Sequence, residues 1–402
     1  MRHAKPSLGT TRNDALQPPP SSLSGISLTM WLSSGTRHDG RLGAAQVGGD
    51  RVNRADPAGR PWGLLVTPRL DQWAAQWDEL VGRSPLPSPF LRSWWLTGVG
   101  GRRCRFLLIV QDDRLLGGLA LEEGRRLGLP CLRMMGSGPL CPDHLDLLAA
   151  PGYEDTVVQA VRAWLRRPGA RLVDLEGIGP GSLLIRALPG RVRGEPLAVA
   201  PWARLSATAD TYLAARPPRF RRNFRKARAR LTAQGAAYRI DRGQSAVRSL
   251  ETLRRLHSAQ WGGRSRFLPS FDRFAAACRL GAEFDEVAVH ELHVHDTVIA
   301  IMVSFEVAGR VSLYQSARLT DFRWRDASVV LLTESISDAC DRGFAEVDLL
   351  RGSEAYKRNF APEQRDLLRL RTSNAWAGRA GMRTELAVRR AGVAGRRLLP
   401  SR

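Results

Sequence analysis

The stretch that decides the fold is Glu346–Phe360, which reads EVDLLRGSEAYKRNF. It begins as a short apolar strand with one acid, Asp348, among the aliphatic residues. Arg351 and Gly352 then form a turn, since glycine adopts the backbone conformations that end a strand. The polar and aromatic residues that follow closely are Tyr356, Lys357, Arg358 and Phe360. This pattern is typical of a ligand-contacting loop, and the alternative is a surface helix start behind an Arg-Gly turn.

The elements before this stretch have the order of an α/β unit. Residues 285–307 predict a hairpin with its turn at His295–Thr297. A third strand is expected over 311–317, and apolar residues at helical spacing predict a helix over 328–341. The strand of Glu346–Leu350 closes the unit.

The same order occurs earlier in the chain. Residues 105–121 predict a hairpin, and a helix over 153–166 leads into a strand over 171–178. The triplet Val-Asp-Leu follows the helix in both halves, centred on Asp174 and on Asp348. We therefore expect an α/β (α+β) fold of two tandem units of about 150 residues, each a mixed central sheet flanked by helices.

Composition divides the chain into four parts. Residues 1–60 are rich in Gly, Pro, Ser and Arg and lack apolar periodicity, which indicates a disordered extension. Two domains are expected over 61–205 and 206–372. Residues 373–402 are again rich in Gly, Ala and Arg and are expected to form a basic tail.

The chain is strongly basic, with 61 basic and 39 acidic residues and a net charge of +22. Such a charge favours anionic partners. Only three of the basic residues are lysines, however, and an arginine excess of this kind accompanies a GC-rich genome. The charge alone therefore does not indicate a nucleic-acid-binding protein.

The five cysteines stand at scattered positions without a Cys-x-x-Cys pair. This argues against a disulfide scaffold or a zinc site and is typical of a reducing cytoplasm. No apolar run approaches the roughly 18 residues of a membrane span, and no apolar segment typical of a signal peptide follows the first residues. We expect a cytoplasmic protein without an integral membrane span and leave its oligomeric state open.

Six short phrases stand in a fixed order along the two halves. They are GSG (136–138), DHLDLL (143–148), FRRNFRKAR (220–228), LHSAQW (256–261), YQSARLTD (314–321) and VDLLRGSEAYK (347–357). In this order and spacing they resemble the GNAT-type acyltransferases of the CelD and FemAB-like group, in which two GNAT folds lie in tandem.

The resemblance implies transfer of an acyl group from acyl-CoA to an amine of a cell-envelope or polysaccharide-related acceptor, a small molecule or a glycan. Acyl-CoA would be a co-substrate, and no tightly bound cofactor is expected. FemAB-like members use aminoacyl-tRNA as the donor, which gives a first alternative. A second alternative is a non-catalytic, degenerate GNAT protein that binds nucleic acid or an anionic membrane surface.

The resemblance places the donor site at a strand followed by a helix whose free amides bind a diphosphate. Here that place is Phe322–Ser328, where Arg323, Arg325 and Ser328 are the expected donor-binding residues. The turn contains no glycine, and Asp326 is expected to cap the helix that follows.

Two residues are candidates for catalysis. Tyr314 lies in the strand before the donor turn and would orient the amine or give a proton to a leaving thiolate; the alternative is a buried tyrosine with a satisfied hydroxyl. Glu306 lies in an apolar strand, where burial would raise its pKa and suit a general base. Strand alternation would instead turn Glu306 to solvent.

The acceptor or donor is expected to contact the opening stretch and the basic helix over 219–234. We interpret Asp348 as a structural acid, because its counterpart Asp174 occurs where no such loop follows. The expected substrate-binding residues are Arg222, Arg351, Gly352, Tyr356 and Lys357, with Lys357 as the main anion-binding contact.

The histidines are expected to be structural. His257 lies on a predicted helix between Leu256 and Trp261, where a hydrogen-bonding role is favoured. His290, His293 and His295 are expected on the solvent face of one strand, and no metal site is predicted.

Overall fold

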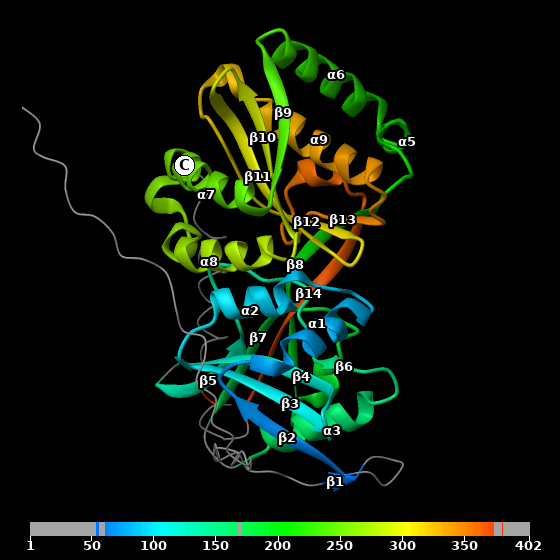
Figure 1. Cartoon of the computed structure of the whole chain (residues 1–402), viewed down its shortest axis with the longest axis vertical. Helices are drawn as coiled ribbons and strands as arrows, with labels where there is room; N and C mark the ends of the chain where they lie inside the picture. Colours follow the sequence, from blue (N-terminus) through cyan, green and yellow to red (C-terminus); the bar gives the residue numbers. More distant parts are fainter. Residues whose placement is uncertain are drawn as a thin grey trace, which may run out of the picture. The chain divides into compact units, whose positions relative to one another are not determined.

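The computed structural model describes residues 54–55, 61–126, 128–167, 171–190, 192–373 and 380 (Figure 1). Most of the predicted extension, 1–60, and most of the predicted tail, 373–402, lie outside the described residues. Within the extension the structure describes β1 (Arg54–Ala55), which pairs with β2 (Pro61–Thr67).

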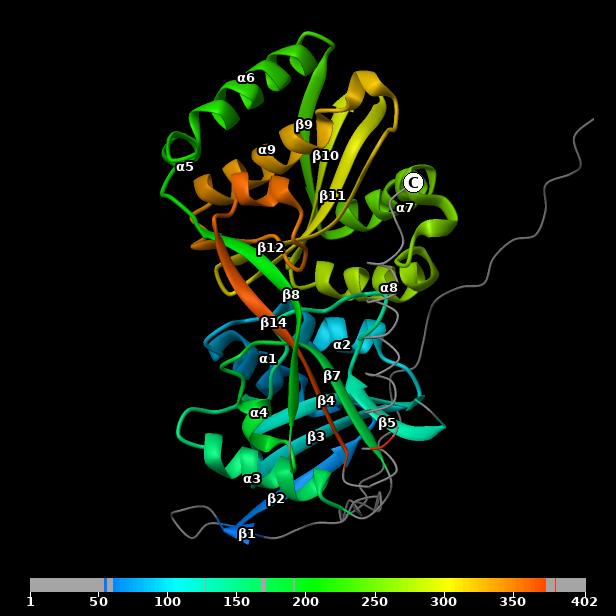
Figure 2. The same ribbon diagram turned by 180° about the vertical axis from the view of Figure 1, so that it is seen from behind.

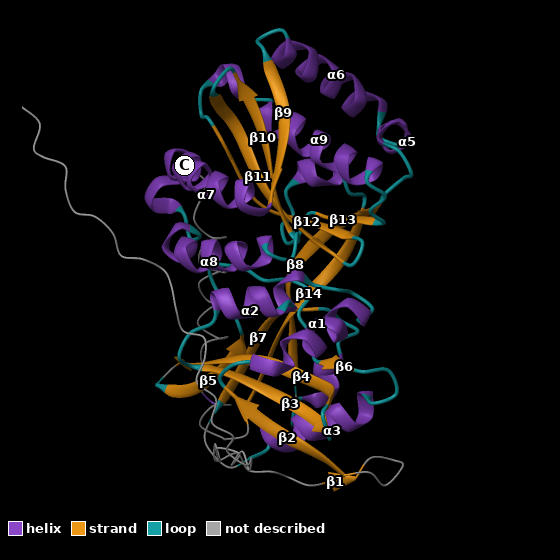
Figure 3. Ribbon diagram, in the orientation of Figure 1, coloured by secondary structure: helices purple, strands orange, loops and turns teal. Residues whose placement is uncertain are grey.

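The described strands form one 14-stranded sheet. The strands of the first half are, in spatial order, β2, β3 (Cys104–Gln111), β4 (Arg114–Arg126), β5 (Leu129–Met134) and β7 (Leu172–Ile178), with the short β6 (Leu148–Ala149) beside β4. Those of the second half are β13 (Glu346–Asp348), β12 (Arg310–Arg318), β11 (Thr297–Val307), β10 (Val287–Val294) and β9 (Ala236–Arg242). The two predicted hairpins are confirmed as β3–β4 and β10–β11 (Figure 3).

The helices repeat in the same order in both halves. The first half has α1 (Ala74–Arg83) and α2 (Ser93–Val99) before β3, α3 (Glu154–Leu165) before β7, and the short α4 (Leu183–Ala187) after it. The second half has α7 (Gly243–Trp261) and α8 (Phe271–Ala282) before β10, and α9 (Ala327–Asp341) before β13. In each half the strand before and the strand after the last crossover pair in parallel, β5 with β7 and β12 with β13. The predicted tandem GNAT-like α/β fold is therefore confirmed.

Two long strands cross between the halves. β8 (Arg193–Arg204) follows the first half in sequence but pairs with β13, and the last strand, β14 (Glu363–Ser373), returns to pair with β7. Figure 2 shows β8 and β14 side by side, and the two pair antiparallel over most of their length. The boundary between 61–205 and 206–372 stays a prediction, since the sheet runs continuously across it.

Helix α6 (Pro218–Thr232) shows why a very basic segment folds as a helix here. Pro218 stands at its first position, where a missing amide has no cost. Phe220, Phe224 and Leu231 recur on one face and are buried, whereas the arginines occupy the other faces. The short α5 (Ala209–Ala214) precedes it, and Gly235, with φ of +81°, turns the chain into β9.

The junction of the halves is an apolar contact between α2 and α8. Trp94 and Trp95, predicted to fill the core, are buried, and their rings pack on Phe305 of β11. A Cβ at Gly98 would lie 2.2 Å from the Ala277 Cα, so only glycine allows this approach. The first half therefore packs directly against the helices that flank the second half's sheet.

Candidate functional site

In the sheet of the second half, β12 and β13 separate after a short stretch of pairing. The two strands pair in parallel only from Arg310 to Ser312, opposite Glu346 to Asp348. β13 ends there, whereas β12 continues to Arg318. A cavity of about 660 Å³, called the main cavity below, lies where the two strands separate. It is lined by residues of α7, β12, the start of α9 and the loop after β13. The polar and aromatic lining residues are His257, Gln260, Trp261, Tyr314, Gln315, Ser316, Ser328, Arg351, Glu354, Tyr356 and Lys357.

Tyr314 forms the wall of the cavity on β12. The register between β11 and β12 passes from Leu313 to Gln315, so Tyr314 is the extra residue of a bulge. Its hydroxyl donates a hydrogen bond to the Leu140 carbonyl oxygen at 2.5 Å. Burial raises the pKa of Tyr314 well above its usual range, so the phenol is protonated at neutral pH.

The loop after β13 forms the opposite wall. Leu350 and Gly352 have positive φ, +53° and +142°, so the chain turns sharply at the strand end. The Lys357 ammonium group donates to the carbonyl oxygens of Leu349, Leu350 and Arg351 at 3.1, 3.4 and 3.0 Å. Its Nζ also lies 3.3 Å from the exposed Glu354 carboxylate. A Cβ at Gly352 would lie 2.6 Å from this Nζ, so the glycine leaves room for the Lys357 ammonium group to bind inside the turn.

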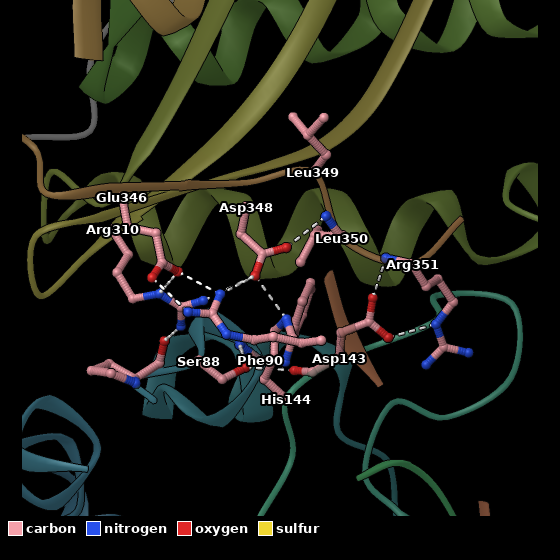
Figure 4. A network of polar contacts seen from close by, with 12 residues as sticks. Ser88, Phe90, Asp143, His144, Arg310, Glu346, Asp348, Leu349, Leu350 and Arg351 are labelled. Carbon is pink, nitrogen blue, oxygen red and sulfur yellow. Dashed lines mark hydrogen bonds and ion pairs between the residues drawn. The ribbon is translucent and has the colours of Figure 1, made fainter. Parts of the chain in front are cut away.

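Arg351 reaches from this loop to the first half of the chain. Its backbone amide and its Nε donate to the two carboxylate oxygens of Asp143 at 2.6 and 2.5 Å (Figure 4). Its Nη2 donates to the Pro142 carbonyl oxygen at 2.7 Å. The guanidinium in the cavity wall is thus held by residues more than 200 positions earlier in the chain.

Next to this contact lies a buried ionic network (Figure 4). The Asp348 carboxylate lies 2.8 Å from His144 Nε2, 3.0 Å from Arg310 Nη2 and 3.4 Å from Arg365 Nη1. Glu346 pairs with the same two arginines. Burial opposes ionisation of Asp348, but His144 and Arg310 outweigh it and lower its pKa to about 2. Its counterpart Asp174 is likewise paired with two arginines, Arg126 and Arg369, so both acids have structural surroundings.

The three predicted donor-binding residues lie in different places. Ser328, at the start of α9, lines the cavity. Arg325 lies over the Phe322 ring and lines a second cavity of about 450 Å³, which shares Val329 and Tyr356 with the first. Arg323 is exposed, pairs with Asp321 at 2.9 Å and lines neither cavity.

The prediction that Asp326 caps α9 with its side chain is wrong. Asp326 is the residue before the helix, but its carboxylate makes no capping bond and pairs instead with Arg230 of α6 at 2.7 Å. Arg230 lies within reach because α6 packs over α9, which the sequence of the turn does not reveal. The amides at the start of α9 are therefore not occupied by Asp326.

The surroundings of Glu306 include two arginines, Arg242 at the end of β9 and Arg342 directly after α9. Glu306 is buried, so the expectation that strand alternation turns it to solvent is wrong. Its carboxylate pairs with Arg342 at 2.6 Å and with Arg242 at 3.1 Å, and it does not line the main cavity. Arg222, the predicted contact on α6, is exposed and also lies outside both cavity linings.

The expected solvent face of histidines is corrected at His290. His290 and His293 are three residues apart, so a regular strand turns them to opposite faces; His290 is buried between Tyr238 and Ser304, with hydrogen bonds of 2.7 and 2.8 Å. Burial lowers the pKa of His290 to about 3. In the part of the chain that the structure describes, no group of three or more His, Cys, Asp or Glu is arranged to hold a metal ion.

His257, for which the sequence favoured a structural role, lies at the cavity and is a candidate functional residue. It is 6% exposed and lines the main cavity. Its Nδ1 is buried without a hydrogen-bond partner among the described residues. Burial lowers its pKa below the ordinary value of 6.5. The signal was present in the sequence, because His257, Gln260 and Trp261 share one helix face, but the cavity beside that face was not predictable.

Comparison with known proteins supports the fold and the enzyme class. Residues 218–358 match the family model of an acetyltransferase (GNAT) domain. FemX is similar in structure with a TM-score of 0.54 and 10% identity, over 73% of this chain and 95% of FemX. The C-terminal (DUF2156) domain of a putative lysylphosphatidylglycerol synthetase from Agrobacterium fabrum is similar with a TM-score of 0.51 and 12% identity, over 79% of this chain and 96% of that domain. No curated protein sequence matches the chain.

At these identities the similar structures show a shared fold. Among the described residues, no helix has the length and hydropathy needed to cross a bilayer. Every residue that lines the main cavity falls within the matched range, which runs from the start of α6 past Lys357. Residues 218–358 therefore form an acetyltransferase (GNAT) domain, and the protein is an acyltransferase.

Proposed function

We propose that this enzyme is a CelD-like or FemAB-like N-acyltransferase that moves an acyl group from acyl-CoA to an amine of a cell-envelope or polysaccharide-related acceptor in the cytoplasm. The observation that carries the proposal is the cavity at the carboxyl ends of the diverging strands β12 and β13. In α/β sheets, ligands bind outside the carboxyl ends of parallel strands. An acyl thioester there would lie between Tyr314 and the loop after β13.

The second cavity gives the donor's phosphates a place to bind. Lys226, Arg230 and Arg325 line it together with Asp326, which pairs with Arg230, and it meets the main cavity at Tyr356 and Val329. Phosphate groups are bound by clusters of guanidinium and ammonium groups. A donor that spans both cavities would place its thioester beside Tyr314 and its phosphates beside these three cations.

The chemistry requires two proton transfers. The amine nitrogen attacks the thioester carbonyl carbon, a C–N bond forms, and the C–S bond breaks. We assign to His257 the proton that the amine loses, because its imidazole lines the cavity and its lowered pKa keeps it neutral. Tyr314 gives its phenolic proton to the departing thiolate once its hydroxyl turns from the Leu140 carbonyl oxygen, and the proton on His257 then restores the phenol through solvent.

The remaining predicted residues take other roles. Glu306 is assigned no part in the chemistry, since its carboxylate is paired with two arginines outside the cavity lining. Tyr356, which is 49% exposed, borders both cavities and is a substrate contact in this proposal. The three carbonyl partners of Lys357 favour a role in holding the loop over the anion-binding role expected from the sequence.

One observation favours a second function, aminoacyl transfer from aminoacyl-tRNA. Helix α6 carries seven basic and no acidic residues. Two of the seven, Arg228 and Arg230, pair with acids, whereas the others have no acidic partner among the described residues. The unpaired cations are Arg219, Arg221, Arg222, Arg225 and Lys226. A row of cations of this kind fits the phosphates of RNA.

Donor binding decides between these functions. Acyl-CoA at 100 times its Kd is expected to stabilise the purified protein by about 2.7 kcal/mol, measured as a rise in the thermal midpoint. Arg325→Glu should weaken this effect about tenfold in Kd, since it reverses a charge in the second cavity. Arg219→Glu makes the same charge change on an exposed residue outside both cavities and should leave the Kd unchanged.

A shift with aminoacyl-tRNA and none with acyl-CoA would replace the first function by the second. A protein whose midpoint neither donor moves would contradict both transferase proposals and leave a non-catalytic binding protein.

Lys357→Met should lower kcat/KM about tenfold. Methionine keeps most of the length of the side chain but removes three hydrogen bonds to the turn that carries Arg351. Glu354→Gln removes only the exposed carboxylate partner of Lys357 and should change kcat/KM less than about twofold. Steady-state kinetics with an amine acceptor measure both variants. Equal effects of the two would show that the carbonyl contacts do not matter.

A further inference from the structure

The segment Leu140–His144 of the first half makes a series of contacts with the wall of the main cavity. The Leu140 carbonyl oxygen accepts a hydrogen bond from the Tyr314 hydroxyl, and the Pro142 carbonyl oxygen accepts one from Arg351 Nη2. Asp143 and His144 then contact Arg351 and Asp348 (Figure 4). Four of five consecutive residues thus each hold a residue of β12, β13 or the loop after it.

The segment itself is held firmly in the first half. The Ser88 hydroxyl donates to the Asp143 carbonyl oxygen at 2.8 Å. The Leu145 amide donates to the Gly177 carbonyl oxygen at 2.9 Å, and Leu145 forms an isolated parallel bridge with Ile178. Gly177 has φ of +80°, and a Cβ there would lie 2.3 Å from the Pro142 carbonyl oxygen. The backbone of β7 is therefore shaped to receive the segment.

The repeat explains why the segment lies there. In the second half, β12 and β13 diverge and leave the main cavity. In the first half the corresponding strands, β5 and β7, pair in parallel only at Cys131–Leu172 and Leu132–Val173. Beyond that pair, Leu145 of the DHLDLL phrase bridges to the end of β7. The first half uses this gap to hold a segment whose polar groups turn toward the other half.

Asp143 is the residue of the segment with the strongest claim to a functional role. Its side chain is 0% exposed, and burying a carboxylate is costly unless a partner compensates it. The compensation comes from Arg351, which it grips at the backbone amide and at Nε. One carboxylate thus fixes both the position of the loop and the direction of its guanidinium.

We infer that the first half of the chain acts as a positioning domain for the acyl-transfer site. Asp143 is the positioning residue, and it orients Arg351 toward the acyl donor. This inference rests on the proposed function for its consequence in catalysis. Its structural part, a loop after β13 held by the first half, stands independently of which donor binds. Asp143 touches no reacting atom and acts through Arg351.

Two asparagine variants test the inference. Asp143→Asn removes the negative charge that faces Arg351 and replaces one of the two acceptor oxygens by an amide nitrogen. The matched control is Asp174→Asn, which makes the same change at another buried acid paired with two arginines, Arg126 and Arg369, away from the main cavity. Both variants should lose thermal stability, because each replaces a buried carboxylate that pairs with half-buried arginine side chains.

A positioning role of Asp143 predicts that the two variants differ in loop exchange and in activity, whereas a loss of stability alone predicts no such difference. Hydrogen exchange of the amides of residues 349–357 should become about tenfold faster in Asp143→Asn and stay unchanged in Asp174→Asn. With acyl-CoA and an amine, kcat/KM should fall about tenfold in Asp143→Asn only, assayed well below both thermal midpoints.

Equal exchange of residues 349–357 in the two variants would overturn the inference. If the wild-type protein turns over no acyl donor, the proposed function fails, while the exchange comparison still decides whether Asp143 positions the loop. Faster exchange with unchanged kcat/KM would show that the held loop has no part in acyl transfer.

Discussion

Replacing His257 by glutamine is expected to lower kcat about 100-fold, which is within the contribution of a general base to catalysis. Glutamine keeps a polar side chain of similar size on α7 but cannot take up a proton. The imidazole of His257 lines the cavity and is neutral at pH 7, so it is the group that we assign to the attacking amine.

The role of His257 as a base also predicts how kcat/KM changes with pH. Because burial lowers the pKa of His257 below 6.5, the base is active at neutral pH and is lost as the pH falls through that lowered value. The wild-type kcat/KM should therefore fall on the acidic side, and the fall assigned to His257 should be absent in His257→Gln.

A second histidine variant separates chemistry from stability. His293→Gln makes the same substitution at a residue that pairs with Glu291 at 2.8 Å and lies outside the cavity lining. Its kcat should stay within about twofold of wild type. A His257→Gln enzyme with near-normal kcat and an unchanged acidic limb would remove His257 from the mechanism.

The largest effect on stability is expected from Asp348→Ala, a loss of about 3–5 kcal/mol in the free energy of unfolding. The substitution takes the Asp348 carboxylate from the buried His144 and Arg310 and the half-buried Arg365, and leaves the two arginines with Glu346 alone. Urea denaturation at pH 7 measures the loss. Asp366→Ala, on the exposed face of β14, is the control and should cost less than about 0.5 kcal/mol.

The same network makes part of the stability depend on pH. The pKa of Asp348 is lowered in the folded state from 3.8 to about 2, so the ionised form stabilises the fold. This contribution, about 2 kcal/mol, is present above pH 3.8 and is lost as the pH falls toward 2. In Asp348→Ala the corresponding acid sensitivity should be missing. A variant as stable as wild type at pH 7 would show that the network contributes nothing.

The repeated order of strands and helices could be predicted because each element has a local cause. The apolar runs of β10 and β11 and the turn between them predict a hairpin from neighbours in sequence alone. The recurrence of Val-Asp-Leu at Asp174 and Asp348 then revealed the duplication. What failed was local reasoning about single polar residues, such as Glu306, His290 and Asp326, whose surroundings come from other elements.

The opening stretch shows the same division. Its sequence by itself determined a short strand, a glycine turn and a loop with Lys357, because strand propensity and glycine's freedom act over a few residues. Only the tertiary structure decided that Lys357 closes the turn on its own carbonyl groups. It also decided that Arg351 is held by Asp143 and that His257 faces the cavity. These contacts join residues up to 208 positions apart, and the position of such partners depends on how the whole sheet is assembled.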